Sequence, residues 1–271
     1  MTTKALSHLR RMRGGSQSCL MRCEDGHAYV VKFQNNPQSP RVLANEWLAT
    51  KIGASLGLPV PPCAVIDVGR DLIERTEDLK IDFGSHQQPC TPGLQFGSRL
   101  VGGLMPGLAT DYLPTESLQQ VVNLDEFAGC LVFDKWTCNQ DGRQAVFHKK
   151  QRERQYRAAF IDQGFCFNAD DWKLVDAPLK GVYARNAAYR NVTGWHDFEP
   201  WLTRVEEFQG DRIWDIASSI PQEWYNNDRQ SLECLVEQLS RRRLLIRELI
   251  IQFRESSRDP FPNWGASKES Q

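Results

Sequence analysis

Four charged side chains, far apart in the sequence, are of the types that phosphate chemistry requires. Lys32 lies in the apolar stretch "YVVKF" and Glu46 follows on a helical pattern, while Asp141 lies in "NQDGR" and Asp162 in "FIDQGF". An ammonium can hold phosphate oxygens if a carboxylate balances its burial. One aspartate can orient a hydroxyl and accept its proton, and the other can bind Mg²⁺. Each also has a simpler interpretation, as a solvent-facing strand lysine or as a turn acid.

Two neighbouring features could support the same chemistry. Gly14, Gly15 and Ser16 lie in "RGGSQS", where paired glycines allow backbone amides to approach phosphate oxygens. The alternative is an ordinary hairpin turn. Arg143 follows Asp141 by two positions and could hold the loop or neutralise phosphate. The segment "NQDG" is also typical of a simple turn.

The first part of the chain is predicted to be rich in strands. Residues 17–33 predict a hairpin around "EDG", and residues 63–68, "CAVIDV", predict a strand. A helix is predicted over 39–56, with Ser39 as its cap and Gly57 at its end. The stretch "IDFGSHQQPCTPG" is rich in turn residues and predicts a loop, whereas "LQFGSRLV" predicts another strand.

The second part is predicted to be mostly helical. Helices are expected over "PTESLQQVV", over "LDEFAGCLVFDKWTC" and over roughly 229–255, with "AAFIDQGFCF" as strand, turn and strand. The boundary between the parts lies near residues 102–110. We therefore expect a β-rich lobe over 1–103, a helical lobe over 104–258 and a tail over 259–271.

Composition narrows the function without naming it. The 271 residues are 41% hydrophobic and 25% charged, with a formal net charge of −1, which does not favour nucleic acid as a partner. The N-terminus lacks an apolar signal segment and no stretch is long enough to span a bilayer, so we expect a soluble, cytoplasmic protein without a membrane partner. The eight cysteines form no CxxC and the five histidines no HxxxH, which predicts reduced thiols and no structural zinc.

The order of these features resembles a known enzyme family. The segment "DKWTCNQDGRQAVF", followed by "AAFIDQGFCF", is similar to HipA-like kinases, specifically the short bacterial proteins made of that kinase domain alone. The resemblance extends over roughly residues 10–255. It implies an α+β, two-lobed protein-kinase-like fold with a β-rich N-lobe and a mainly helical C-lobe. It also implies ATP and Mg²⁺ as cofactors and transfer of the γ-phosphoryl group to a hydroxyl, on Ser or Thr of a protein or on a small molecule.

The resemblance assigns a role to each candidate residue. Three positions match the loop that covers the phosphates: Gly14, Gly15 and Ser16. Lys32 matches the lysine on the α- and β-phosphates and Glu46 its ion-pair partner. Residues 98–103, "SRLVGG", match the hinge that meets adenine through backbone groups, with Leu100 and Val101 at its centre. The catalytic aspartate is Asp141, accompanied by Arg143, and the magnesium ligand is Asp162.

One position departs from the pattern. Many relatives have a metal-binding asparagine five residues after the catalytic aspartate, where this chain has Val146. Gln144 or Asn139 could replace it. If "QAVF" is a strand, Gln144 and Val146 share a face, so we expect Gln144 to reach the metal. The departure leaves open two alternatives to an active kinase: a nucleotide-binding pseudokinase and a non-enzymatic interaction module.

Overall fold

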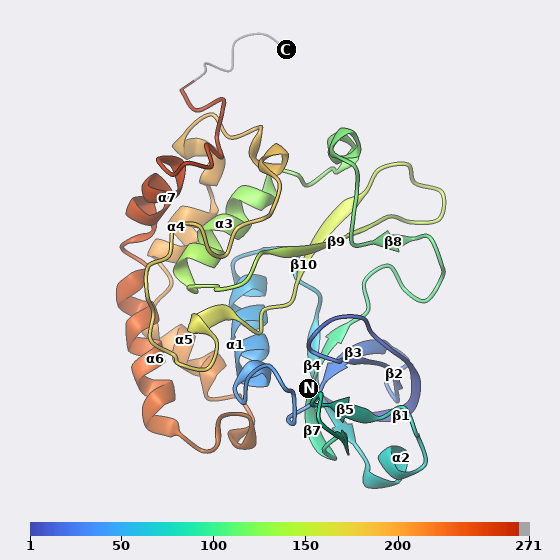
Figure 1. The fold of residues 1–271 in the computed structure, drawn as a ribbon. Helices are drawn as coiled ribbons and strands as arrows, with labels where there is room; N and C mark the ends of the chain where they lie inside the picture. The colour runs from blue at the N-terminus through green and yellow to red at the C-terminus, as the bar shows by residue number, and fades with distance from the viewer. Residues whose placement is uncertain (266–271) are drawn as a thin grey trace.

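A closed five-stranded barrel forms the N-terminal lobe (Figure 1). The computed structural model describes residues 1–265. Neighbouring barrel strands are antiparallel, except for the parallel pair β1 and β4. In barrel order, the strands are β1 (Thr2–Arg11), β2 (Cys19–Cys23), β3 (Ala28–Lys32), β7 (Gly93–Arg99) and β4 (Cys63–Val68).

The alternation of side chains along β3 places some residues in the barrel core and others on the face towards the helical lobe. Val31 points into the barrel and is fully buried with Ile66 of β4. Lys32, the next residue, therefore points to the opposite face, towards the helical lobe. Gly97 of β7 is required at its position, since a Cβ there would come within 2.4 Å of Ile66 Cγ1. The hairpin predicted for residues 17–33 is confirmed, and Gly26 in its turn has a φ of 80°.

The single long helix of this lobe, α1 (Val42–Ser55), packs against both lobes. Nearly all of its residues are buried, which agrees with its position between the barrel and the C-terminal lobe (Figure 1). Gly57 ends it with a φ of 78°, as predicted. The predicted Ser39 cap is wrong: its Oγ accepts a hydrogen bond from the Arg41 N–H at 3.1 Å, before the helix begins.

The segment predicted as a loop, 81–93, forms most of a β-hairpin. A short helix, α2 (Arg70–Glu74), precedes an antiparallel hairpin formed by β5 (Lys80–Asp82) and β6 (Gln87–Pro89). The loop prediction was wrong for these strands, because their breaker residues form the turn of the hairpin. Asp82 Oδ1 accepts a hydrogen bond from the Gly84 N–H at 2.7 Å and holds that turn.

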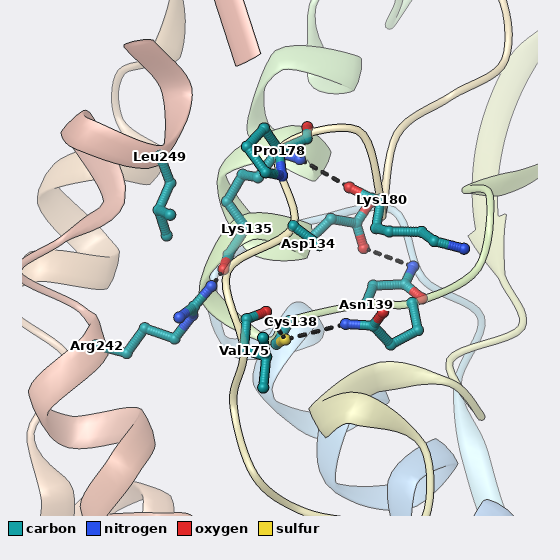
Figure 2. Close-up of a pocket in the computed structure, with 11 residues that line it drawn as sticks. Asp134, Lys135, Cys138, Asn139, Val175, Pro178, Lys180, Arg242 and Leu249 are labelled. Atoms are coloured by element: carbon teal, nitrogen blue, oxygen red, sulfur yellow. Dashed lines mark hydrogen bonds between the residues drawn. The ribbon is translucent and has the colours of Figure 1, made fainter. Parts of the chain in front are cut away.

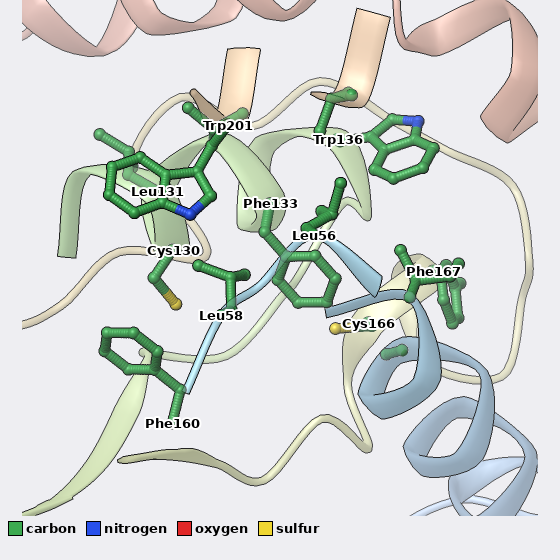
Figure 3. Close-up of a cluster of buried hydrophobic side chains, with 14 of the residues drawn as sticks. Leu56, Leu58, Cys130, Leu131, Phe133, Trp136, Phe160, Cys166, Phe167 and Trp201 are labelled. Carbon is green, nitrogen blue, oxygen red and sulfur yellow. The ribbon is translucent and has the colours of Figure 1, made fainter. Parts of the chain in front are cut away.

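The C-terminal lobe combines helices with a small antiparallel sheet in the order β10-β9-β8. The strands are β8 (Ala109–Thr110), β9 (Gln144–His148) and β10 (Arg157–Ile161). The helices are α3 (Glu126–Trp136), α4 (Trp201–Glu206), α5 (Gly210–Ala217), α6 (Arg229–Arg242) and α7 (Ile246–Arg254). Figure 3 shows the buried cluster that joins the lobes, which includes Leu56 after α1, Phe133 of α3 and Phe160 of β10.

Three predicted elements of this lobe differ in the structure. The segment predicted to be a second strand after Asp162 is a 3-10 turn (Cys166–Asn168), in which Phe167 has a φ of 61°. The long helix predicted over 229–255 is two helices, because the chain turns at exposed Leu244 and Leu245 before α7 buries its apolar face. The helix predicted over "PTESLQQVV" is a 3-10 helix (Thr115–Gln120).

The expected tail is partly packed onto this lobe. Phe261 is buried, and the Trp264 ring lies 5.3 Å from the Trp195 ring. The rest of the expected tail, 266–271, lies outside the described residues. No helix in the described part of the chain is long and apolar enough to cross a membrane.

Candidate active site

One ammonium between two carboxylates forms the centre of the site. Lys32 Nζ on β3 lies 2.5 Å from Glu46 Oε1 on α1 and 2.7 Å from Asp162 Oδ1, directly after β10. The predicted pairing of Lys32 with Glu46 is therefore present. Asp162 adds a second carboxylate from the other lobe, so the three residues join the barrel, α1 and the C-lobe sheet.

Burial and charge act against each other in this cluster. Burial alone would lower the pKa of Lys32, but the charges of Glu46 and Asp162 raise it above its ordinary value. Burial raises the pKa of Glu46. Burial also opposes ionisation of Asp162, yet the charge of Lys32 outweighs it and lowers the Asp162 pKa. With both carboxylates ionised, the three side chains have a net charge of −1. The Asp162 side chain is 26% exposed.

The backbone after β10 brings Asp162 to Lys32. Asp162 has a φ of 62°, a left-handed conformation that is uncommon for a residue other than glycine and that recurs at functional sites. The next amide, from Gln163, donates to Glu46 Oε2 at 3.0 Å. A Cβ at Gly164 would lie 2.5 Å from Val42 Cγ2, so only glycine lets this segment approach α1 closely.

Asn45 also holds this segment, and the sequence analysis missed it. Its Nδ2 donates to the carbonyls of Gly164 at 2.8 Å and Ala169 at 2.6 Å, and its Oδ1 accepts from the Trp172 indole at 2.7 Å. The side chain is fully buried. The available signal was an asparagine inside an otherwise apolar helical pattern, since buried amides require several partners.

The loop between α3 and β9 carries Asp141 and leads to Gln144. Asp141 is exposed; its Oδ1 accepts from the Gly142 N–H at 2.8 Å, and its own N–H donates to Asn139 Oδ1 at 3.1 Å. Gln144 Nε2 donates to Asp162 Oδ2 at 3.0 Å. The structure therefore brings Gln144 and Asp162 together, on the strand face that alternation predicts for Gln144 and Val146.

Arg143 lies on the buried side of the same loop. Its guanidinium forms a two-pronged ion pair with Asp134 of α3, with Nε 2.9 Å from Oδ2, and both side chains are 1% exposed. Nη1 donates to the Ile161 carbonyl at 2.9 Å, one residue before Asp162. A guanidinium so enclosed cannot contact phosphate, so the expected catalytic role of Arg143 is corrected to a positioning role. Asp134, its partner, was missed because a single acid in an apolar helix gives no sign of its partner.

The glycine turn and the hinge lie at either end of the N-lobe strands. Gly14 has a φ of 117°, and the Ser16 carbonyl accepts from Asn36 Nδ2 at 3.0 Å, which fastens the turn between β1 and β2. In the expected hinge, the Leu100 N–H donates to the Ala28 carbonyl at 2.9 Å. The Leu100 N–H is therefore already engaged within the N-lobe, and Val101 is the next residue towards the C-lobe.

A small cavity lies between the C-terminal end of α3, residues 175–180 and Arg242 of α6 (Figure 2). At about 10 Å³ it is far too small for a nucleotide. Lys135 of α3 lies beside it and donates to the carbonyls of Pro178 at 2.6 Å and Lys180 at 2.7 Å. Burial lowers the pKa of Lys135 to about 8. This lysine fastens residues 178–180 to α3 and takes no part in the cluster around Lys32.

The donor set constrains how a metal could bind. The described residues contain no group of three His, Cys, Asp or Glu side chains able to hold a metal ion. Mg²⁺ in phosphoryl-transfer sites is commonly held by one or two carboxylates together with substrate phosphates and water. Asp162 with a neighbouring amide side chain fits that kind of shared site.

Comparison with known proteins identifies the family. The model of the HipA-like kinase family matches residues 7–249. The chain belongs to the HipA-like kinase family. This confirms the predicted resemblance and indicates kinase-type phosphotransfer. No protein with a curated description matches the sequence significantly.

Solved structures confirm the two-lobed protein-kinase-like fold of this HipA-like kinase. The Helicobacter pylori proinflammatory kinase CtkA is similar with a TM-score of 0.60 and 13% identity, over 95% of this chain and 99% of that one. Hydra Fam20 is similar with a TM-score of 0.59 and 12% identity, over 96% of this chain and 88% of that one. The Golgi casein kinase with Mn/ADP bound is similar with a TM-score of 0.55 and 12% identity, over 94% of this chain and 74% of that one. At such identities the likeness establishes the fold alone.

Proposed function

We propose that this protein is an ATP- and Mg²⁺-dependent cytoplasmic kinase that transfers the γ-phosphoryl group to a Ser or Thr hydroxyl of a protein. The observation that carries the proposal is the position of Lys32, 2.5 Å from Glu46 and 2.7 Å from Asp162. A buried strand lysine balanced by a helix glutamate and adjacent to a metal-binding aspartate is the arrangement that protein kinases use to hold nucleotide phosphates.

Asp162 and Gln144 are the proposed metal ligands. The surplus negative charge around Lys32 favours a cation, and Asp162 is open enough to receive one. Gln144 now donates to Asp162, but a half-turn of its amide presents Oε1 to the same space. Asn139 is unsuitable, because its amide is buried and engaged by Asp134 and by the Asp141 N–H.

The remaining residues take roles consistent with this geometry. Bound Mg²⁺ would neutralise charge on the transferring phosphoryl group. Lys32 would hold phosphate oxygens, and Glu46 would keep its ammonium in place. Asp141, exposed at its loop, would orient the acceptor hydroxyl and take its proton. Three residues would cover the phosphates, Gly14, Gly15 and Ser16, and backbone groups of Leu100 and Val101 would meet adenine.

Asp162→Asn tests the metal role. Binding of a non-hydrolysable ATP analogue is measured with and without Mg²⁺, and transfer is followed with ³²P-labelled ATP and a generic Ser/Thr protein. The variant should lose nearly all the Mg²⁺-dependent part of binding, because a neutral amide replaces the only charged ligand. Asp170→Asn, an exposed acid of the following segment, is the matched control and should bind normally. Equal Mg²⁺ dependence in Asp162→Asn and wild type would exclude this metal role.

Gln144→Ala separates the active kinase from the pseudokinase. Val146 occupies the usual asparagine position, which is the observation that favours a nucleotide-binding pseudokinase. If Gln144 completes the metal site, Gln144→Ala should reduce turnover about tenfold or more and leave ATP-analogue affinity nearly unchanged. Binding without any transfer in the wild type would indicate the pseudokinase, and absence of ATP-dependent thermal stabilisation would indicate a non-enzymatic module.

A further inference from the structure

The connection between β9 and β10 is strongly basic in a chain that is nearly neutral. Residues 149–157 contain five cations and one acid, whereas the whole chain has a formal net charge of −1. The loop extends to the outer edge of the molecule beyond the β9–β10 pair (Figure 1). The cations in this basic hairpin are Lys149, Lys150, Arg152, Arg154 and Arg157.

Two hollows lie at the base of this basic hairpin, and Arg157 lines both. The larger, about 430 Å³, lies between the hinge, the connection from α1 to β4, the start of α3 and the far ends of β9 and β10. The smaller, about 390 Å³, is lined by Val122 and by residues of the hairpin itself. Neither hollow is lined by the side chains proposed for catalysis and metal binding, which are Lys32, Glu46, Asp141, Gln144 and Asp162.

The larger hollow combines an apolar wall with exposed positive charge. Its apolar lining comes from residues 59–62, Leu100, Val101 and Ala158–Ala159. Glu126 on its rim already accepts from Asn123 Nδ2 at 2.6 Å. Arg157 is exposed, and its charge acts on Glu126 of the same hollow, where it opposes the rise in the Glu126 pKa that burial causes. A volume of this size lies in the range of pockets that enclose a ligand or a large side chain.

We propose that the basic hairpin and the larger hollow bind an acidic peptide segment of a partner protein. An apolar side chain of that segment fills the hollow, and flanking carboxylates meet Arg157 and the hairpin cations. Charge complementarity of this kind gives specificity and fast association. The proposal goes beyond the phosphotransfer function and does not require it, because none of the proposed catalytic side chains lines the hollow. The hollow does share Leu100 and Val101 with the hinge that is proposed to meet adenine.

The lining favours a peptide over nucleic acid. Glu126 and Glu153 each line one of the hollows and would repel a continuous phosphate backbone, whereas spaced carboxylates can avoid them. Tyr156 is the aromatic residue of the hairpin, and Lys149 covers its ring at 4.8 Å, so it offers no open face for base stacking. The balanced charge of the whole chain also differs from the basic surface typical of nucleic-acid proteins.

A direct binding experiment tests this proposal with the full chain. Three fluorescein-labelled 12-residue peptides are compared by anisotropy: one rich in Glu and Asp around a single Trp, one with that Trp replaced by Ser, and one with the acids replaced by their amides. A single-stranded RNA of the same length is the fourth probe. The acidic Trp peptide should bind best, and each of the other two peptides about fivefold or more weakly. Binding should fall as salt rises.

Variants locate the binding surface. Arg152→Glu/Arg154→Glu should weaken the acidic Trp peptide about tenfold, and Arg157→Gln should weaken it severalfold. Arg241→Glu, at an exposed arginine of α6, is the matched control and should leave binding unchanged. Thermal melting and ATP-analogue binding of each variant should equal those of the wild type, which separates this surface from the nucleotide site.

Three results would overturn the proposal. They are equal binding of the Trp and Ser peptides, tighter binding of the RNA, and loss of affinity in Arg241→Glu equal to that in the hairpin variant. A failure of phosphoryl transfer would leave the proposal standing, because every readout is binding. Conversely, an inactive peptide surface would leave the proposed kinase reaction untouched.

Discussion

Two ion-pair clusters, one between the lobes and one within the C-terminal lobe, are built differently. In the first, Lys32 is shared by Glu46 and Asp162, and the Asp162 side chain is 26% exposed. In the second, Arg143 is paired with Asp134 alone, and both side chains are 1% exposed. With both carboxylates ionised, the first cluster has a net charge of −1 and is partly open to solvent at Asp162, whereas the second is balanced and closed.

The difference indicates that the two clusters have different roles, one in positioning the backbone and the other in the proposed chemistry. The Asp134–Arg143 pair is neutral overall and has no solvent access, so it does not attract a further ion. Its role is therefore to position the backbone around it. It holds the Ile161 carbonyl at 2.9 Å and thereby places Asp162, the next residue, in the open cluster. In the proposed kinase reaction the open cluster would exchange partners, with Asp162 leaving Lys32 for a metal and Lys32 turning to phosphate.

Asp134→Ala should break the closed cluster and have the largest effect. It leaves the Arg143 guanidinium buried without a counter-charge, which typically destabilises a protein by about 3–5 kcal/mol. Urea denaturation measures the free energy of unfolding. Asp170→Ala, at an exposed acid, is the control and should change it by less than about 0.5 kcal/mol. A loss below about 1 kcal/mol in Asp134→Ala would show that the closed cluster does not support the fold.

Lys32→Met should break the open cluster, with its main effect on binding. Charge-assisted hydrogen bonds to phosphate contribute about 1.5–3 kcal/mol, so ATP-analogue affinity should fall about ten- to a hundredfold. The free energy of unfolding should fall less than in Asp134→Ala. Asp162 is partly solvated, and Glu46 still accepts a hydrogen bond from the Gln163 N–H. Calorimetric titration measures the affinity, with Lys4→Met on β1 as an exposed control. Unchanged affinity in Lys32→Met would remove the basis of the comparison.

The sequence predicted the open cluster better than the closed one, for a physical reason. Lys32 in an apolar strand and Asp162 at a strand end are locally conspicuous, because charge and apolar pattern conflict there. Asp134 sits in a helix without a local conflict that points to Arg143, and the two meet only when α3 packs beside β9. Long-range pairing of this kind has no short-range pattern, so it could not be read before folding.

The same reasoning explains the errors in the fold. Strands β2, β3, β4 and β7 and helix α1 have strong strand or helical patterns, and they were predicted close to their observed bounds. The β5–β6 hairpin consists of two three-residue strands with mostly polar exposed residues, so turn residues dominated its pattern. The break between α6 and α7 arises from packing of α7 against the core and not from a proline or glycine, and therefore left no signal in the sequence.

Gly164→Ala should sharpen the comparison by crowding only the open cluster. The added Cβ would lie 2.5 Å from Val42 Cγ2 and 3.4 Å from Glu46 Oε1. Overpacking of this kind costs about 1–3 kcal/mol, and the displaced segment should also weaken ATP-analogue binding. Thermal melting measures the change. Gly69→Ala is the matched control, since a Cβ there meets no atom within 4 Å. Equal melting of the two variants would show that the close approach at Gly164 is not required.

Lys135 provides a third kind of buried charge and the smallest expected effect. Its ammonium is held by two carbonyls and burial lowers its pKa to about 8, below the ordinary value of 10.5. Between these values the unfolded chain binds more protons than the folded protein, so this group makes stability rise with pH. Below the folded pKa both states are protonated, and the cost of burying the charge is fully present. Relative to Lys135→Met, the wild type should therefore gain about 1 kcal/mol of unfolding free energy between about pH 7.5 and 9.

The difference between wild type and Lys135→Met cancels thiols and other groups that titrate over the same range. Urea denaturation at several pH values measures it, with Lys180→Met as the control, because that side chain is exposed on the same segment. The control should follow the wild type at every pH. A difference between wild type and Lys135→Met that stays constant with pH would mean that Lys135 keeps an ordinary pKa. The carbonyls of Pro178 and Lys180 would then compensate its charge as fully as a carboxylate does for Arg143.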